Sequence, residues 1–449
     1  MKKQKKNSSR SPVVALVSLG CAKNTVDSEL ILGRFAESGW LIAQEPAEAD
    51  ICLVNTCGFI QDAREEASNV LHELRGLKEG GGPRAVVALG CLVKRVADSP
   101  ELENFLSAAD ARVSFPDYSR LPEICAGLLG KRVELGEPES YSDFLIRPRL
   151  RMGSPHTAYL KISEGCSNPC TFCSIPKIRG KQMSRLMDEI VAEAKALIEA
   201  GAVEINLIAQ DTTAYGKDWD GELHLAGLLT ALRNEIGDDV WFRLMYACPQ
   251  HLTREVLEVM ASDARFCRYI DMPLQHISDR MLDVMGRRLT RLQTVEKLDM
   301  IREILPDCAI RTAFIVGHPG ETEEDFSELL AFVKEGRFTH AGVFTYSAEP
   351  GTISARLADD VSAAVKEERR ARLMEAQRQV SAARCAAQVG QTIEVMIDGS
   401  GEDGLIGRTQ HEAPEVDGMV FLPEFDAVPG DRFDVTVSAS LDYDLIAGC

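Results

Sequence analysis

The sequence lacks long apolar runs, an excess of basic residues and a convincing export signal, and each absence excludes a class of protein. Its 449 residues include no apolar run near the roughly 20 residues that a membrane-spanning helix needs. The formal net charge of −19 argues against a generic polyanion binder, because nucleic-acid affinity comes largely from basic patches. The start, MKKQKKNSSR before VVALVSLGCA, imitates a signal peptide, but we interpret it as a disordered basic tail before a buried strand. We therefore expect a globular cytoplasmic protein without a membrane partner.

The thirteen cysteines are an odd number, spread over a long chain. A disulfide framework belongs to small secreted domains, so the count favours a reduced protein with metal or thiol chemistry. Seven of these cysteines share no pattern, and we interpret them as packing or surface thiols: Cys52, Cys125, Cys248, Cys267, Cys308, Cys385 and Cys449.

The first predicted domain, residues 12–130, alternates short apolar strands with amphipathic helices. The strands VVALVSLGC, ADICLVNTCGF and AVVALGC each end at a cysteine, and ARVSF is a fourth. This alternation predicts a parallel α/β sheet, in which the carboxyl ends of the strands meet along one edge. Cys21, Cys57 and Cys91 are therefore expected to converge there. Taken singly, cysteines at strand ends are commonly inert core residues.

The second predicted domain, residues 152–385, follows a linker of about residues 137–155. Six strand-like runs, AYLKIS, VEINLIA, WFRLMY, YIDMPLQ, AIRTAFIVG and HAGVFTYS, are separated by helices. Six repeats of strand and helix predict a partial (β/α)6 barrel, and a charged helix of about residues 361–388 closes it. The third domain, residues 386–449, alternates at period two between Gly, Pro and Asp turns, which predicts a small five-stranded β-barrel.

A three-cysteine loop directly follows the first strand of the second domain. Cys166, Cys170 and Cys173 lie in EGCSNPCTFCSIP. A structural zinc site usually has four protein ligands in paired spacings. Three thiolates in one short loop instead suit an iron–sulfur cluster in which one iron lacks a protein ligand. A structural zinc or redox thiol loop is the alternative.

The three cysteines have the spacing C-x3-C-x2-C, Phe172 stands directly before the third, and the loop follows strand one of a six-stranded partial barrel. This arrangement resembles the radical S-adenosylmethionine (SAM) enzymes. The resemblance implies that the open iron binds SAM, and that one electron from the cluster cleaves it to a 5′-deoxyadenosyl radical. It also places Gly317 and Gly320, in VGHPGETEEDF, along the SAM site. Polar residues at the ends of the second and fourth strands are candidates for SAM or substrate contacts, although such residues also cap helices: Gln210, Asp211, Gln275 and His276.

The three strand-end cysteines of the first domain then predict a second three-thiolate cluster. A cluster-binding α/β domain, a radical SAM barrel and a small β-barrel together resemble the methylthiotransferase family. SLGCAKN, VDSE, NTCGFI, KISEGC, IPKIRGK and LIAQDTTAYG are most similar to its RimO branch. MSRLMDE, His318 and YACPQH depart from that pattern, which puts local pocket contacts in doubt. The resemblance implies two [4Fe–4S] clusters, SAM, a TRAM-like C-terminal barrel that docks substrate, and an electron donor such as flavodoxin or ferredoxin.

The substrate class is predicted from the charge of the last domain. From residue 386 onward there are 13 acids and 2 bases, a balance of −11. Such a surface would repel RNA phosphate and attract a basic protein, unless it is merely a solvated acidic surface. The RimO resemblance implies methylthiolation of the β-carbon of an aspartate on the twelfth protein of the small ribosomal subunit. Two alternatives stay open, a tRNA adenosine (isopentenyladenosine) methylthiotransferase and a non-catalytic iron–sulfur scaffold or electron carrier.

Overall fold

A computed structural model describes residues 10–237, 239–402, 404–423 and 425–448. The predicted basic tail lies almost wholly outside these residues, and Cys449 lies outside them altogether. Contacts within the chain divide it into two compact units, Met1–Met152 and Gly153–Cys449. Among the described helices, none combines the length and apolarity needed to cross a membrane.

The first unit is built on the predicted parallel sheet, whose strand order is β2-β1-β3-β4-β5. Its strands are β1 Val13–Ser18, β2 Leu41–Ile42, β3 Ile51–Thr56, β4 Ala85–Gly90 and β5 Ala111–Arg112. Its helices are α1 Ala22–Glu37, α2 Gln61–Glu79, α3 Cys91–Asp98, α4 Leu121–Leu128 and α5 Tyr141–Leu145, with 3-10 turns η1 Pro46–Glu48, η2 Pro100–Leu106 and η3 Phe115–Arg120. Strands β3 and β4 are fully buried, as expected of near-continuous apolar runs in a parallel sheet. The two-residue strand β2 is too short to be recognised from its sequence.

The segment interpreted as a linker is instead largely part of this first unit. Helix α5 buries Phe144, whose ring packs edge-on against Tyr118 at 6.1 Å. Beyond it, Arg149 forms a buried ion pair of 2.8 Å with Glu29 of α1. Pro, Arg and Ser gave this segment the composition of a loop, whereas its few anchoring contacts lie more than 20 residues away in the sequence.

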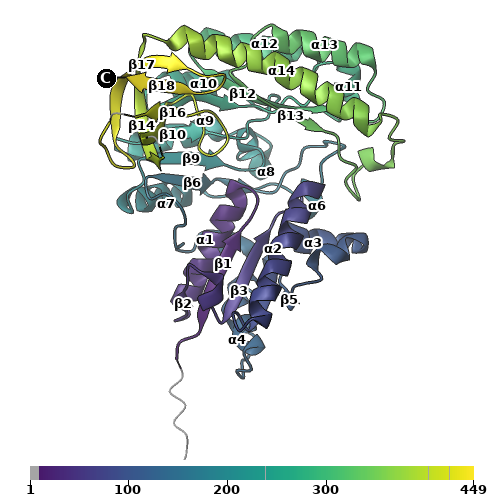
Figure 1. Cartoon of the computed structure of the whole chain (residues 1–449), viewed down its shortest axis with the longest axis vertical. Coiled ribbons are helices and arrows are strands. Elements are labelled where there is room, and N and C mark those ends of the chain that lie inside the picture. The colour runs from purple at the N-terminus through teal and green to yellow at the C-terminus, as the bar shows by residue number, and fades with distance from the viewer. Residues whose placement is uncertain (1–9, 238, 403, 424, 449) are drawn as a thin grey trace, which may run out of the picture. The chain divides into compact units, whose positions relative to one another are not determined.

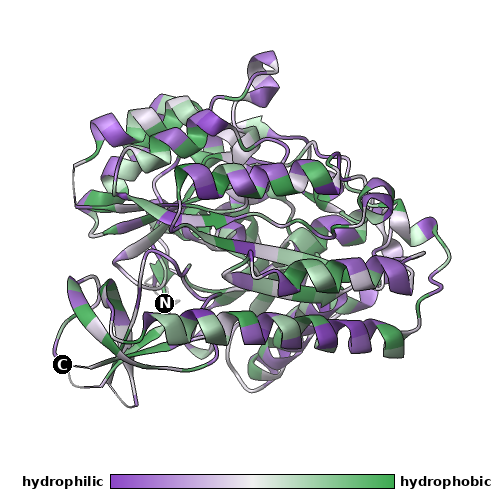
Figure 2. Ribbon diagram, turned by 90° about the horizontal axis from the view of Figure 1, so that it is seen from above, coloured by the Kyte–Doolittle hydropathy of each residue, from purple (hydrophilic) through white to green (hydrophobic). Residues whose placement is uncertain are grey.

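The second unit contains the six predicted strands in one parallel sheet, of order β13-β12-β11-β10-β9-β6 (Figure 1). These strands are β6 Thr157–Lys161, β9 Glu204–Ile208, β10 Trp241–Leu244, β11 Phe266–Asp271, β12 Ala309–Val316 and β13 His340–Thr345. The covering helices are α7 Met187–Glu199, α9 Leu225–Glu235, α10 Arg254–Ala261, α12 Arg291–Ile304, α13 Glu323–Lys334 and α14 Ala363–Gln388. Short elements at its loops are β7 Ser163–Glu164, β8 Met183–Ser184, α6 Ile175–Ile178, α8 Lys217–Asp220, α11 Asp279–Val284, η4 Thr212–Ala214 and η5 Ser354–Arg356. Figure 2 shows the covering helices striped in purple and green, as one-sided packing against a sheet requires.

The last part of the second unit is the predicted five-stranded barrel, closed in the order β14-β15-β16-β18-β17. Its strands are β14 Thr392–Gly401, β15 Gly404–Arg408, β16 Val420–Leu422, β17 Arg432–Ser440 and β18 Leu445–Gly448. The barrel is anchored to the parallel sheet by buried charges. Arg408 of β15 lies 2.8 Å from Glu204 of β9, and Arg243 of β10 lies 2.9 Å from the same carboxylate.

Candidate iron–sulfur sites

The loop that carries Cys166, Cys170 and Cys173 is held as the tip of a small hairpin. Strands β7 and β8 pair antiparallel on either side of it. At its base Gly165 has φ +76°, and a Cβ there would lie 2.2 Å from the Lys181 carbonyl oxygen, so only glycine fits. The Cys166 N–H donates to the Gly180 carbonyl at 3.1 Å. The base of the loop that carries the three thiols is therefore tightly closed.

Each of the three sulfurs accepts one hydrogen bond. The Asn168 N–H lies 3.5 Å from Cys166 Sγ, and the Ile175 N–H lies 3.4 Å from Cys173 Sγ. Arg287 Nη1 lies 3.5 Å from Cys170 Sγ. Hydrogen bonds to cysteine sulfurs stabilise iron–sulfur clusters and set their potentials, so this donor set fits a cluster. Burial raises the pKa of Cys173 to about 12, so in the absence of a bound cation this thiol keeps its proton.

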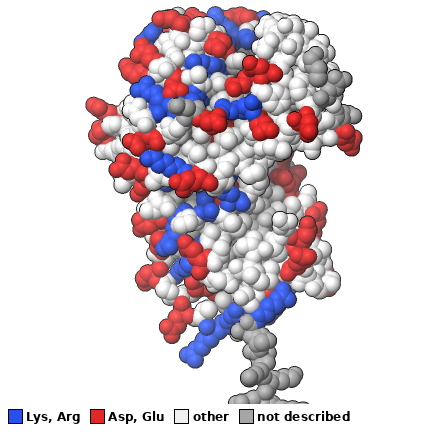
Figure 3. Space-filling model, turned by 90° about the vertical axis from the view of Figure 1, so that its left-hand side faces the viewer, with Lys and Arg blue, Asp and Glu red and all other residues white. Residues whose placement is uncertain are grey.

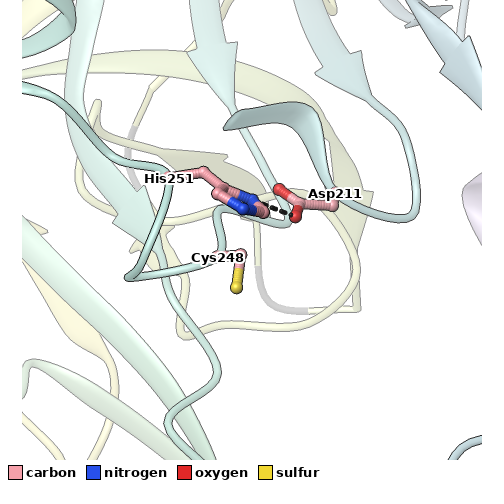
Figure 4. Close-up of side chains that lie close together, drawn as sticks. All are labelled: Asp211, Cys248 and His251. Atoms are coloured by element: carbon pink, nitrogen blue, oxygen red, sulfur yellow. Dashed lines mark hydrogen bonds and ion pairs between the residues drawn. The ribbon is translucent and has the colours of Figure 1, made fainter. Parts of the chain in front are cut away.

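A polar network lies beside this loop, at the ends of β9 and β10. Asp211, Cys248 and His251 each place one potential ligand atom within 4.8 Å of the others (Figure 4). The lone pairs of the nitrogen and oxygen atoms are already engaged. Asp211 accepts hydrogen bonds from Asn168, His251 and Thr213, and His251 Nε2 faces Lys217 Nζ at 2.9 Å. A cationic neighbour and occupied acceptors disfavour a metal ion, and the network instead connects His251 through Asp211 to the cysteine loop.

The other residues that are predicted to contact the cofactor lie at the same end of the sheet. Several of them also make contacts within the protein that would require the same residue without a cofactor. Gln210 Nε2 donates to Glu164 Oε1 at 2.5 Å. Burial alone would raise the pKa of Glu164, but the charges of Lys161 and Arg179 outweigh it and lower that pKa to about 2. Phe172 is half-buried within the cysteine loop.

Gly317 and Gly320 both have positive φ, at +71° and +82°. A Cβ at Gly317 would lie 2.2 Å from Lys366 Cγ of α14, so helix packing already requires glycine there. His276 is fully buried and bonds Glu321 at 3.1 Å, while Gln275 takes φ +74° in a backbone bridge to Phe314. These contacts suit a structural role for His276.

The strand-end cysteines of the first unit meet at one edge of its sheet. They follow β1, β3 and β4, which are neighbours in the sheet order. A Cβ placed on Gly20 would lie 3.3 Å from Cys57 Sγ, and a Cβ on Gly58 would lie 3.0 Å from the Cys91 carbonyl carbon. The loops therefore approach one another more closely than any larger residue would permit. Cys21 caps α1 and Cys91 begins α3, and helix N-termini favour the negative charge of thiolates.

Three residues that contact the two cysteine sets were not identified from the sequence: Asn24, Asn168 and Arg287. His251, which reaches Asn168 only through Asp211, was not identified either. Arg287 lies more than a hundred positions from Cys170 and belongs to no local pattern. Cys248, interpreted as a packing thiol, lies with Cys170 and Arg287 along one small cavity. The glycines beside Cys21, Cys57 and Cys91 are the one signal in the sequence that could have indicated close approach of the loops.

The six-stranded parallel sheet, with its three-cysteine loop after the first strand, defines a radical SAM enzyme. Residues 160–333 match the Radical SAM superfamily, residues 13–111 the Uncharacterized protein family UPF0004, and residues 389–449 the TRAM domain. The ribosomal protein uS12 methylthiotransferase RimO of Anaeromyxobacter sp. (strain K) is 43% identical, over 96% of this chain and 92% of the relative. RimO of Geobacter sulfurreducens is 42% identical, over 96% and 97%. The chain belongs to the RimO family of radical SAM methylthiotransferases, which confirms the predicted fold class, enzyme class and cofactors, two [4Fe–4S] clusters and SAM.

Solved structures share the fold at low identity. The radical SAM methyltransferase TsrM from Kitasatospora setae superposes with a TM-score of 0.53 at 14% identity, covering 77% of each chain. The cobalamin-dependent radical SAM enzyme OxsB gives a TM-score of 0.51, also at 14% identity, over 80% of this chain and 56% of that one. These likenesses concern the fold alone.

Proposed function

We propose that this chain transfers a methylthio group to the β-carbon of an aspartate of ribosomal protein uS12. The observation that carries the proposal is the presence of two separate three-cysteine sets in one chain whose full-length relatives are named uS12 methylthiotransferases. Cys166, Cys170 and Cys173 would hold the cluster that binds SAM. Cys21, Cys57 and Cys91 would hold the second cluster.

The chain's own residues would hold and orient these groups. When bound, the clusters and SAM supply the electron, the radical that removes a hydrogen atom, and the sulfur and methyl group. The half-buried donors Arg287, Asn168 N–H and Ile175 N–H would fix the sulfurs of one cluster. Phe172, Gln210, Gly317 and Gly320 would line the SAM site near this loop. The domain boundaries at residues 152 and 385 are part of the same proposal, with the segment after residue 130 assigned to the first domain.

The exposed acids of the C-terminal barrel support a basic protein as substrate. Some acids of this domain are used internally, because Asp398 pairs with Arg408, and Asp417 pairs with Arg311. The described acids that remain exposed are Glu394, Glu402, Glu415, Asp426, Asp431, Asp434 and Asp442. Figure 3 shows acidic and basic side chains interspersed on the face that it draws, so the support comes from the exposed acids of the barrel itself, which suit a basic partner better than RNA. A flavodoxin- or ferredoxin-type protein would supply electrons in the cytoplasm.

Mass spectrometry of uS12 tests the proposal directly. Cells that lack this chain should contain uS12 without the methylthio group, and the wild-type gene should restore it. A variant with alanine at Cys166, Cys170 and Cys173 should restore nothing and should form no 5′-deoxyadenosine. A variant with alanine at Cys21, Cys57 and Cys91 should still cleave SAM but transfer no methylthio group. Unchanged uS12 in the deletion strain, or a loss of methylthio groups from tRNA instead, would contradict the substrate.

A further inference from the structure

The first unit must hold three thiols that come from three different strands. No covalent link fixes the distance between loops that follow separate strands. A cluster, however, can be bound only by thiolates that lie at a fixed spacing. One side chain, Asn24 in the first turn of α1, contacts the loops of all three cysteines. It is 1% exposed.

The carboxamide of Asn24 joins the first two loops. Its Nδ2 donates to the Leu19 carbonyl at 2.8 Å and to the Thr56 carbonyl at 3.2 Å. Leu19 lies two residues before Cys21, and Thr56 immediately precedes Cys57. Both donor hydrogens of the amide are therefore used to connect the end of β1 to the end of β3.

The remaining polar atoms of Asn24 complete the connection. Its backbone N–H donates to the Cys21 carbonyl at 2.8 Å, and its carbonyl accepts from Asn55 Nδ2 at 2.9 Å. The Cys91 thiol donates to Asn24 Oδ1 at 3.8 Å. Iron binding removes the thiol proton and with it this last contact, but the hydrogen bonds to Leu19 and Thr56 do not depend on that proton.

We propose that Asn24 is the positioning residue that pre-assembles the Cys21, Cys57 and Cys91 site for its cluster. This inference rests on the proposed function, which assigns a cluster to these cysteines. Only an amide fits the role at this size, because aspartate offers no hydrogen to the two carbonyls and alanine offers no polar atom. A buried asparagine in a helix is otherwise unfavourable, since its amide must be satisfied and its helix propensity is low.

The test compares Asn24→Ala and Asn24→Asp in the full chain after anaerobic reconstitution. Asn69→Ala, at an exposed position on α2 in the same unit, is the matched control, and the triple alanine variant of Cys21, Cys57 and Cys91 is the benchmark. Wild type and the control should bind about eight irons per chain, four for each cluster. Both Asn24 variants should fall to about four irons, with the electron paramagnetic resonance signal of the barrel cluster retained and 5′-deoxyadenosine formed within about twofold of wild type.

A second measurement uses the iron-free chain, so that it does not depend on cofactor loading. Alkylation of Cys57 and Cys91, followed by mass spectrometry, should be about tenfold faster in Asn24→Ala than in Asn69→Ala, because two hydrogen bonds that close the loops are lost. Wild-type iron content and wild-type alkylation in both Asn24 variants would overturn the inference and leave the proposed function standing. Eight irons in the triple cysteine variant would instead overturn the proposed cluster site itself.

Discussion

Asp211 and His251 lie 40 positions apart in the sequence, and their side chains meet at 2.9 Å between Oδ2 and Nδ1. Lys217 Nζ and Gln250 Nε2 both approach the other ring nitrogen, at 2.9 and 3.1 Å. Since both of these groups carry hydrogens, Nε2 must accept, and the proton of the neutral ring sits on Nδ1 and points at Asp211. The carboxylate is thereby oriented toward Asn168 of the cysteine loop, which donates to the same oxygen at 2.8 Å.

The first prediction concerns this carboxylate. Asp211→Asn should slow 5′-deoxyadenosine formation by about 10- to 100-fold, the range found when a group that orients a metal ligand is lost. The physical reason is that one amide oxygen cannot accept from Asn168, His251 and Thr213 together. The measurement is the rate of SAM cleavage under reductant, with the electron paramagnetic resonance spectrum of the SAM-bound cluster.

The chain offers a matched control for this variant. Asp220 and His224 form another Asp–His pair, at 3.0 Å, but at the solvent-exposed C-terminal end of α8. Asp220→Asn should leave SAM cleavage and the spectrum unchanged. If Asp211→Asn behaves in the same way, the network does not position the cysteine loop.

The second prediction is that the Asp211, Cys248 and His251 group binds no metal of its own. Its acceptors are occupied and Lys217 places a positive charge beside it, so Cys248→Ala should keep the full iron content. Metal analysis after incubation with zinc, in the presence of reconstituted clusters, should give equal values for wild type and Cys248→Ala. One additional zinc per chain in wild type that disappears in the variant would disprove this.

The main elements could be predicted from the sequence because their signals are local. The six strands of the second unit and the strand-end cysteines of the first follow from apolar runs of four to eight residues. Contacts between Asp211 and His251, or between Glu204 and Arg408, could not be predicted, because the sequence around one partner contains no pattern that points to the other. The attachment of the segment after residue 137 could not be predicted for the same reason, since it depends on an ion pair between Arg149 and Glu29, which lie 120 positions apart.

The third prediction concerns the attachment of the C-terminal barrel. Arg408→Gln leaves the buried Glu204 with one cation in place of two, and breaking a buried pair of this kind costs about 3–5 kcal/mol. The free energy of unfolding in urea should fall by that amount. Arg254→Gln breaks the exposed pair with Glu303 and should leave the free energy of unfolding close to that of wild type, because solvent screens such a pair. Equal effects of the two substitutions would show that the pair of Arg408 and Glu204 does not hold the barrel.

The fourth prediction follows from the charge of Glu204. Burial would raise its pKa, but Arg408 and Arg243 outweigh burial and lower the pKa to about 2 from the ordinary 4.5. A lowered pKa in the folded protein contributes stability above pH 4.5 that is lost as pH falls toward 2. The stability advantage of wild type over Glu204→Gln should therefore shrink by about 3 kcal/mol across that window. Glu402→Gln, at an exposed position of the barrel, should show no such change, and an advantage for Glu204 that is constant with pH would refute the assignment.

The last prediction separates stability from substrate binding on the barrel surface. Glu394 of β14 and Asp434 of β17 lie directly opposite each other in register, and both are exposed. Partial desolvation of its carboxyl and the charge of Asp434 raise the pKa of Glu394. Like charges in this position are destabilising, so Glu394→Gln should stabilise the barrel by about 0.2–1 kcal/mol.

If the acidic surface docks a basic protein, the same variant should raise the KM for uS12 while kcat stays the same, and added salt should shrink the difference. Gln391→Glu, one residue before β14, adds a charge of the same sign and should lower the KM. An unchanged KM in both variants would show that positions 391 and 394 do not belong to the docking surface, whatever the stability of the variants.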